Sequence, residues 1–312
     1  MKKALVFGAG GFAGGYLVDE LVNHDYEVYG CSRYSKLVDD RFSGTLVCDL
    51  LDVDRVKTVI SEVNPDFIIN MAGISSVGLS WKIPQTTVDV NVIGPLNILE
   101  TIKSSDLDAS ILFIGSSEEY APSDKPIKET NRLDANNPYG ISKIMLERYC
   151  TLYRDHYGMK IHYVRAFNHT GVGQADTFVI PSWCKQAVEI SNSGKGGVMK
   201  VGNLNVARDF SDVRDVVRAY RMIMESDNCD YIYNVCSGKA LGLDDILNSI
   251  IELSSQHISV EVNSKLIRPV ENDEIYGDHS LITEKLGWNP QYDIKDTIKE
   301  MYEYYDKKIK RQ

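Results

Sequence analysis

A tyrosine and a lysine stand four positions apart in the segment Asn-Pro-Tyr-Gly-Ile-Ser-Lys, as Tyr139 and Lys143. On a helix, this spacing places the two side chains on one face, one turn apart. A free phenol has a pKa of about 10, too high for a base at neutral pH. A neighbouring ammonium stabilises the phenolate and lowers that pKa. The pair therefore predicts proton exchange with an oxygen atom of a substrate.

A short apolar strand further upstream opens onto two serines and two glutamates at 116–119. Ser116 is placed to hold the same substrate oxygen as Tyr139, and Glu118 is a candidate acid or base. A helix start with a chance tyrosine and lysine is the alternative interpretation. The Pro138 that precedes the pair and the serine-bearing strand before it argue against that alternative.

The first fourteen residues predict a second kind of site. An apolar strand at 4–7 runs into a glycine-rich turn, which leads into a helix. Glycines let backbone N–H groups at a helix start approach a pyrophosphate. A glycine-rich turn without a ligand is the alternative, but the strand–turn–helix context favours a dinucleotide. The predicted cofactor contacts in this turn are Gly8, Gly11, Phe12, Ala13 and Gly14.

The end of the second strand indicates which dinucleotide binds. The acidic residue that holds the ribose of NAD is missing, and Arg33 stands near that place. Arg33 would stack on adenine and meet a 2′-phosphate, which favours NADP, while NAD stays possible because a surface arginine is also common there. Further predicted cofactor contacts are Asp49, Leu50, Met71, Ala72, Gly73, Tyr139 and Lys143.

The elements that must position these residues alternate along the chain. Short apolar runs predict strands at 4–7, 27–32, 45–48, 67–70, 111–114 and 161–165. Longer periodic runs predict helices at 12–23, 53–63, 86–104 and 139–157. Strands that are apolar throughout and alternate with helices indicate an α/β fold with a doubly wound parallel Rossmann sheet.

The pattern loosens after 165. Helices are predicted at 213–226, 243–254 and 294–310, and a strand at 231–236. We expect a dinucleotide-binding domain at 1–168, to which segments around 209–238 return. A smaller, mixed α/β substrate domain is expected to take most of 169–312.

Composition excludes several classes of protein. The formal net charge of −10 argues against sequence-independent nucleic-acid binding. Six cysteines without a Cys-x-x-Cys spacing indicate buried, reduced thiols rather than disulfides or a metal site. No apolar stretch is long enough to span a bilayer, and the first apolar run is too short for a signal peptide. We expect a cytoplasmic protein with no metal, nucleic-acid or membrane partner.

These motifs, in this order, resemble the extended short-chain dehydrogenases of the NAD-dependent epimerase/dehydratase family, which act on nucleotide sugars. The resemblance covers nearly the whole chain and includes Arg165-x-x-Asn168-x-x-Gly171. Within the family, three stretches are most similar to the GDP-4-dehydro-6-deoxy-D-mannose reductases. These stretches are Ser-Ser-Glu-Glu-Tyr at 116–120, Phe-Asn-His-Thr-Gly at 167–171 and the segment at 200–210.

The resemblance implies NADPH-dependent reduction of the C4 keto group of a nucleotide-activated 4-keto-6-deoxy sugar, of the type that yields GDP-D-rhamnose, with Tyr139 as proton donor. It also implies a GDP-linked substrate and a homodimer formed through two helices of each subunit. The planar guanidinium group of an arginine can donate two parallel hydrogen bonds to phosphate oxygens. A surface salt bridge is the alternative role for each arginine. The predicted substrate contacts are Ser117, Asn168, Val179, Arg208, Arg268 and Glu271.

Other activities of the same family stay open. Glu118 suits a 4,6-dehydratase, and Ser117 does not exclude one. A C4 epimerase ranks third, because such enzymes usually lack a carboxylate at this place. A cofactor-binding regulator without turnover ranks last, since it has no reason to keep Ser116, Tyr139 and Lys143 together.

Three other groups of residues have a structural alternative to a role in the site. Trp81 either covers the sugar pocket or fills the core. His169 is expected to be structural rather than catalytic. The acidic residues at 209, 212 and 215 are expected to cap a helix and pair with nearby arginines rather than bind a metal ion.

Overall fold

A sheet of seven parallel strands forms the centre of the computed structural model, which describes residues 1–35, 37–228, 232–267 and 272–311. The strands are β1 Lys2–Phe7, β2 Tyr26–Ser32, β3 Gly44–Val47, β4 Phe67–Asn70, β5 Ser110–Ser116, β6 Ile161–Ala166 and β11 Ile232–Val235. Their order is β11-β6-β5-β4-β1-β2-β3, the doubly wound order of dinucleotide-binding folds with one further strand. The predicted fold class is confirmed.

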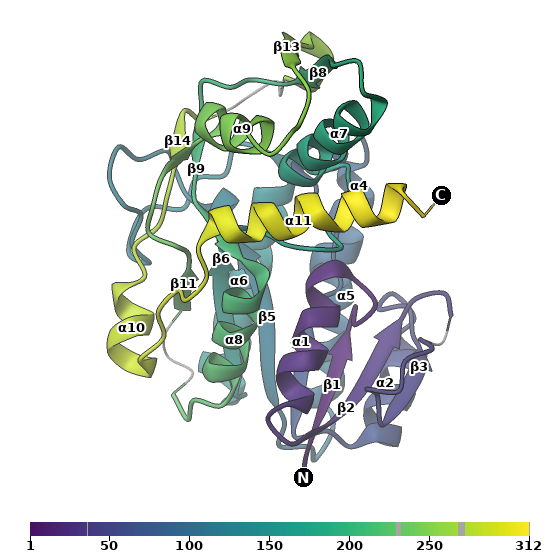
Figure 1. The fold of residues 1–312 in the computed structure, drawn as a ribbon. Helices are drawn as coiled ribbons and strands as arrows, with labels where there is room; N and C mark the ends of the chain where they lie inside the picture. The colour runs from purple at the N-terminus through teal and green to yellow at the C-terminus, as the bar shows by residue number, and fades with distance from the viewer. Residues whose placement is uncertain (36, 229–231, 268–271, 312) are drawn as a thin grey trace.

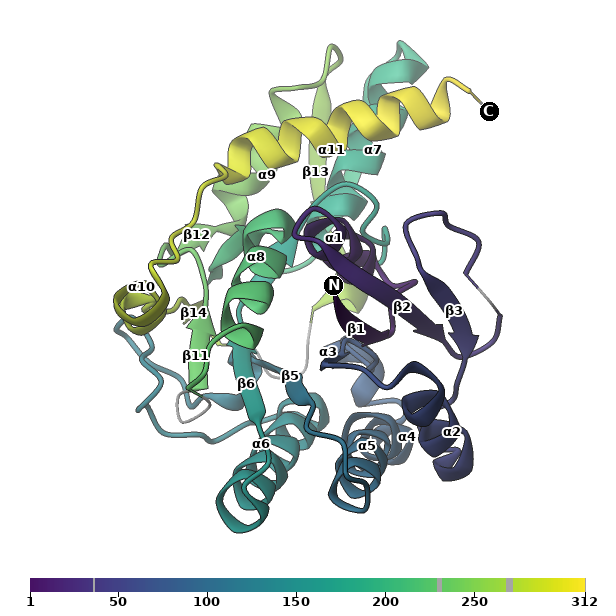
Figure 2. The ribbon, with the colours of Figure 1, turned by 90° about the horizontal axis from the view of Figure 1, so that it is seen from below.

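Helices cover both faces of this sheet, as Figure 2 shows from below. Helices α2 Val53–Val63, α5 Gly94–Lys103 and α6 Pro138–Tyr157 lie on one face, and α1 Phe12–Val22 and α8 Val213–Met224 lie on the other. Two separate apolar cores result, one on each face. The strands are buried on both sides for this reason, which explains why β4 is buried along its whole length.

The long helix predicted at 86–104 is interrupted. It consists of α4 Pro84–Val88, a π-helical segment at Asp89–Ile93, and α5. Such segments insert an extra residue into a helix and often mark functional sites. Asn91, in the middle of this segment, is 1% exposed and faces the interior.

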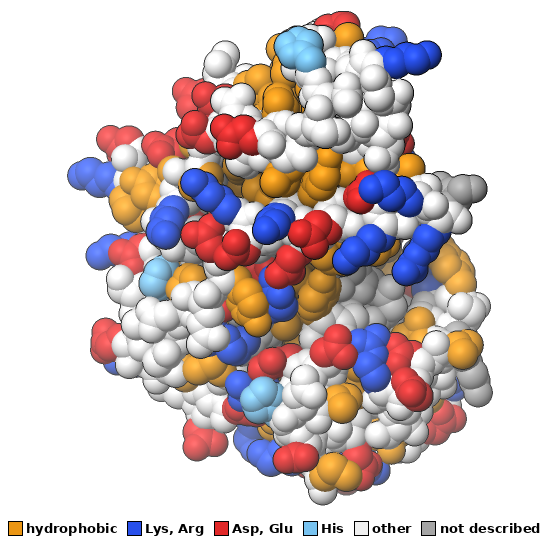
Figure 3. Space-filling model, in the orientation of Figure 1, with side chains coloured by type: hydrophobic (Ala, Val, Ile, Leu, Met, Phe, Trp, Pro, Cys, Tyr) orange, Lys and Arg blue, Asp and Glu red, His pale blue; other side chains and the backbone are white. Residues whose placement is uncertain are grey.

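The remaining elements form a second body with its own core, at the top of Figure 1. It contains α7 Val179–Ser193, α9 Leu243–Ile251 and α11 Ile294–Ile309, with the strand pair β8 Gly197–Val201 and β13 Ile258–Val262. Helix α11 lies across the middle of the molecule, where Figure 3 shows basic and acidic side chains interspersed along it. Its inner side buries Ile298, Met301 and Tyr305, as the sequence periodicity predicts.

Smaller elements complete the fold. They are α3 Val77–Ser80, β7 Asn168–Thr170, β9 Ala207–Arg208, β10 Phe210–Asp212, β12 Leu241–Gly242, β14 Glu274–Ile275 and α10 Ser280–Leu286. The chain returns to the first body through α8 and β11, and α10 then packs against β11. The exact division of the chain at residue 168 stays a prediction.

Five cysteines are free and buried, as predicted, while Cys229 lies outside the described residues. Across the part of the chain that the structure describes, no helix has the length and apolar character needed to cross a membrane.

Candidate active site

The glycine-rich turn lies where β1 ends and α1 begins. Gly8 has a φ of +79°, and a Cβ there would lie 2.7 Å from the backbone nitrogen of Ala72. A Cβ on Gly14 would lie 2.5 Å from the carbonyl oxygen of Gly8. These positions need glycine because the backbone of the loop after β4 and the start of α1 both press against the turn.

The same turn leaves the start of α1 open for an anion. Gly11 is the N-cap residue, and among the described residues no side chain caps the first turn of the helix. The unpaired N–H groups and the positive end of the helix dipole suit a pyrophosphate. The close approach of Gly8 to Ala72 brings the predicted cofactor contacts Met71, Ala72 and Gly73 beside this turn.

Arg33 lies just beyond the end of β2 and is exposed. Its guanidinium carbon lies 4.3 Å from the centroid of the Tyr34 ring. A second arginine of this region, Arg41, is engaged elsewhere. It donates to Asp39 and, at 2.7 Å, to Asp19 of α1. Arg33 is thus the better placed of the two to meet a ligand at the end of β2.

Tyr139 and Lys143 lie on one face of α6, as their spacing predicts. Lys143 Nζ lies 5.8 Å from the centroid of the Tyr139 ring and donates to the carbonyl oxygen of Ile114 at 2.7 Å. The helix begins where it does because the Asn137 side chain accepts a hydrogen bond from the N–H of Gly140, with Pro138 in the first turn. The strand end and the helix start therefore bring Ser116, Tyr139 and Lys143 together.

Burial dominates the pKa values of this pair. It raises the pKa of Tyr139, while a hydrogen bond with Ser116 acts in the opposite direction. In the protein without cofactor the net shift of the Tyr139 pKa is therefore upward, because desolvation of the phenolate dominates; the lowering expected from an ammonium together with a bound nicotinamide stays a prediction. Burial also lowers the pKa of Lys143 to about 8. The phenol is held protonated at neutral pH, which suits a proton donor.

Asn91, which sequence reasoning missed, fixes the loop beside these residues. Its Oδ1 accepts from the N–H of Ile74 at 2.8 Å, and its Nδ2 donates to the Ile74 carbonyl and to Ser142 Oγ, each at 3.0 Å. The amide thus connects the loop after β4 to α6. The π-helical segment orients the Asn91 side chain inward. The sequence pattern predicts a regular helix here and therefore does not reveal this orientation.

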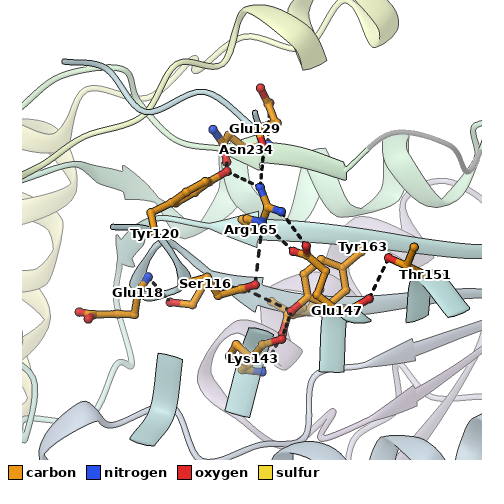
Figure 4. A network of polar contacts seen from close by, with 12 residues as sticks. Ser116, Glu118, Tyr120, Glu129, Lys143, Glu147, Thr151, Tyr163, Arg165 and Asn234 are labelled. Atoms are coloured by element: carbon orange, nitrogen blue, oxygen red, sulfur yellow. Dashed lines mark hydrogen bonds and ion pairs between the residues drawn. The ribbon is translucent and has the colours of Figure 1, made fainter. Parts of the chain in front are cut away.

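The two glutamates of the turn after β5 have different hydrogen-bond partners, and Figure 4 shows Glu118 with Ser116. Ser116 Oγ accepts from the N–H of Glu118 at 3.2 Å. Glu119 turns inward, and its Oε1 accepts from the N–H of Ser116 at 2.6 Å. Glu118 points away from this network and accepts from Asn137 Nδ2 at 2.9 Å.

The predicted substrate contacts are placed less completely. Ser117 is buried next to Ser116, and Asn168 is half-buried in β7. Val179 is the first residue of α7, and Arg208 is buried in β9, where its Nη1 donates to the carbonyl oxygen of Ala207. Arg268 and Glu271 lie outside the described residues.

Two aromatic side chains flank this region. Trp81 is 46% exposed, so its proposed role as core filling is wrong. The His169 ring stacks on Phe12 with centroids 6.3 Å apart, and its Nδ1 lies 3.2 Å from the carbonyl oxygen of Phe167. Burial lowers the pKa of His169, so the imidazole is held neutral.

The acidic residues at 209, 212 and 215 make hydrogen bonds and ion pairs within the fold. Asp212 caps α8 and pairs with Arg214, and Asp215 pairs with Arg218, both as predicted. Asp209 does neither. Its carboxylate accepts from the N–H groups at 237, 238 and 277, so the prediction for this residue is wrong. Within the described ranges, no group of three or more side chains is arranged to hold a metal ion.

Comparison with known proteins identifies the family to which this chain belongs. The model of the GDP-mannose 4,6 dehydratase family matches residues 5–301, so the chain belongs to that family of nucleotide-sugar-modifying enzymes.

Two sequence relatives represent two activities. GDP-6-deoxy-D-mannose reductase of Pseudomonas aeruginosa is 28% identical over 267 residues, which are 85% of this chain and 88% of that protein. GDP-mannose 4,6-dehydratase of Vibrio cholerae is 28% identical over 96% of this chain and 92% of that protein. The solved structure of RMD from Pseudomonas aeruginosa complexed with NADPH has a TM-score of 0.87 at 26% identity, covering 99% of this chain and 100% of that one.

Proposed function

We propose that this protein is an NADPH-dependent reductase of GDP-4-dehydro-6-deoxy-D-mannose, which it converts to the GDP-linked 6-deoxy sugar of the GDP-D-rhamnose type. The observation that carries the proposal is the burial of Tyr139 beside Ser116, which raises the pKa of the phenol, because reduction of a carbonyl needs a proton donor at the oxygen. Similarity to the Pseudomonas aeruginosa reductase supports it.

The residues around the glycine-rich turn fit the cofactor. The open start of α1, beside a turn whose close backbone packing requires glycine at positions 8 and 14, suits a pyrophosphate. Arg33 and the adjacent Tyr34 ring suit an adenine that carries a 2′-phosphate, which favours NADP over NAD. When bound, NADPH supplies the hydride for the C4 carbon.

The side chains of the site then have distinct tasks. Ser116 and Tyr139 hold the C4 oxygen, and Tyr139 donates its proton to it. Lys143, whose Nζ is fixed by the carbonyl oxygen of Ile114, stabilises the phenolate that remains. Asn168, Val179 and Arg208 would contact the sugar and its diphosphate, with Ser117 behind Ser116.

A 4,6-dehydratase is the second candidate, and one observation favours it. The Glu118 carboxylate lies in the same turn as Ser116 and is oriented by Asn137, as an acid or base near C5 and C6 would be. A C4 epimerase ranks below both, because it has no use for this carboxylate.

Two substrates separate the first two activities. The purified protein is given GDP-4-dehydro-6-deoxy-D-mannose with NADPH or, separately, GDP-mannose with NADP+. The reductase oxidises NADPH in proportion to the keto sugar consumed, and a Glu118→Gln variant keeps that activity. Conversion of GDP-mannose to a keto sugar without net reduction of NADP+, and the absence of that conversion in Glu118→Gln, would establish the dehydratase instead.

We also propose that two copies associate through α5 and α6. Apolar side chains project from the outer face of α6, with Ile141, Met145 and Leu152 being 48%, 37% and 56% exposed. Their spacing places them on one stripe, and exposed apolar stripes mark association surfaces. Leu152→Glu should convert a dimer to a monomer in light scattering, whereas Lys57→Glu on α2 should not. A monomeric wild type would refute the proposal.

A further inference from the structure

A buried charged cluster lies directly behind the candidate catalytic residues (Figure 4). Its members are Glu119, Glu147 and Arg165, which are 0%, 4% and 4% exposed. Arg165 donates from Nε and Nη2 to the two oxygens of Glu147, each at 2.7 Å. This two-pronged contact uses the guanidinium charge and identifies Glu147 as its ionised partner.

Glu119 is the second carboxyl group of a cluster that holds one cation. Its Oε2 lies 3.9 Å from Arg165 Nε, beyond hydrogen-bond distance, and has no hydrogen-bond partner among the described residues. An ionised carboxylate needs several donors when it is removed from water, and without them it takes up a proton. One proton, on Glu119, leaves the cluster of two carboxyls and one guanidinium neutral.

The other oxygen of Glu119 connects the two catalytic elements. Oε1 accepts from the N–H of Ser116 at 2.6 Å and lies 3.2 Å from the hydroxyl of Tyr163. That hydroxyl donates to the carbonyl oxygen of Lys143 at 2.9 Å. The space is tight, since a Cβ on Gly115 would lie 2.6 Å from the Tyr163 hydroxyl.

We propose that Glu119 is held as a neutral carboxylic acid and acts as a positioning residue, which fixes Ser116 at the end of β5 and Lys143 on α6. This inference rests on the proposed function for its catalytic consequence, but the protonation state does not depend on it. The Glu119 side chain is fully buried, so its effect is exerted through Ser116 and Lys143.

The charges that face Glu119 shift its pKa in opposite directions. Burial raises its pKa most, the charge of Glu147 raises it further, and the charge of Arg165 lowers it. The result is a pKa well above the usual value. The titratable groups around it are Lys143, Glu147 and Cys150 of α6, Tyr163 and Arg165 of β6, Tyr139, Tyr120 and Glu118.

A neutral Glu119 favours the chemistry next to it. A negative charge on Glu119 raises the pKa of Tyr139. Tyr139 becomes an anion when it donates its proton, so an ionised Glu119 would oppose that step. With its proton, Glu119 still accepts the hydrogen bond from the N–H of Ser116 through Oε1. It then carries no negative charge that would oppose the ionisation of Tyr139.

Infrared spectroscopy of the protein without sugar, in heavy water at neutral pH, tests the protonation state. The difference spectrum between wild type and Glu119→Gln should show the loss of a protonated carboxylic carbonyl band. The matched Glu118→Gln change, at the adjacent position, should leave that band in place. Loss of a carboxylate band in Glu119→Gln would overturn the proposal, whatever reaction the protein catalyses.

Positioning is tested with two variants. Gln keeps a neutral acceptor for the Ser116 N–H, so kcat and its pH profile should match wild type within about twofold. Leu removes the acceptor, so kcat should fall about 10- to 100-fold with an unchanged Kd for NADPH. The Ser116 amide should exchange hydrogen faster in Glu119→Leu and not in Glu119→Gln, a readout that needs no turnover.

The opposite results would overturn the positioning role. They are equal losses of kcat in the two variants, a displaced alkaline limb of the pH profile in Glu119→Gln, or unchanged exchange at Ser116 in both. If Glu119→Leu does not fold, the infrared spectrum and the pH profile of Glu119→Gln still decide. Absence of reductase activity in wild type with the expected infrared and exchange results would refute only the proposed reaction.

Discussion

Replacement of Arg33 tests the preference for NADP. Its guanidinium is exposed at the end of β2 and lies over the Tyr34 ring. A hydrogen bond to a charged group contributes about 1.5–3 kcal/mol, and exposure to water and salt places this one near the lower end. About 1.5–2 kcal/mol corresponds to roughly 10- to 30-fold in affinity. Arg33→Ser should weaken NADPH binding by that factor and leave NADH binding unchanged.

The assay is fluorescence titration of each reduced nucleotide with the purified protein, at low and at high ionic strength. The NADPH preference of the wild type should diminish as salt screens the phosphate contact, and that of Arg33→Ser should not change.

Arg41→Gln is the matched control, because Arg41 lies in the same segment but is bound to Asp39 and Asp19. It should change the two affinities by the same factor. Equal loss of NADPH and NADH binding in Arg33→Ser, or no loss of either, would refute the reasoning.

Three further predictions concern the residues around the proton donor. Tyr139→Phe should lower kcat about 10²- to 10⁴-fold with an unchanged NADPH Kd by titration, and parallel loss of binding would mean a structural role. Because the pKa of Lys143 falls from 10.5 to about 8, the unfolded chain binds more protons between these values. The free energy of unfolding of wild type relative to Lys143→Met should therefore rise by about 3 kcal/mol from pH 8 to pH 10.5 in urea titrations, and a fall would contradict the assignment. Asn91→Ala should reduce the free energy of unfolding by about 1–3 kcal/mol, since it leaves the Ile74 N–H without its acceptor, and a variant as stable as wild type would refute that role.

The sequence was sufficient for the parts of the site that depend on local spacing. Tyr139 and Lys143 share a helix face, and the glycine-rich turn follows a strand, so both can be recognised from a few adjacent residues. The parallel sheet follows from the apolar strands in the same way.

What sequence reasoning missed depends on contacts between distant segments. The inward orientation of Asn91 comes from a π-helical segment, and Glu119 differs from its neighbour Glu118 through packing against β6. The burial that raises the pKa of Tyr139 in the protein without cofactor could not be predicted either, since desolvation is a property of the assembled fold. Helix α7 was missed because Pro181 lies in its first turn, where proline is tolerated although it usually signals the end of a helix.

The transfer of hydrogen from free NADPH to C4 of the sugar is the central claim, and isotope labelling measures it directly. NADPH deuterated at the transferred position is mixed with the protein and GDP-4-dehydro-6-deoxy-D-mannose, and the product is examined by NMR. The account predicts one deuterium at C4 for each NADPH oxidised, in wild type and not in Tyr139→Phe. A converted sugar without deuterium at C4 would contradict it, because a dehydratase or epimerase returns the hydride it has taken from its own substrate.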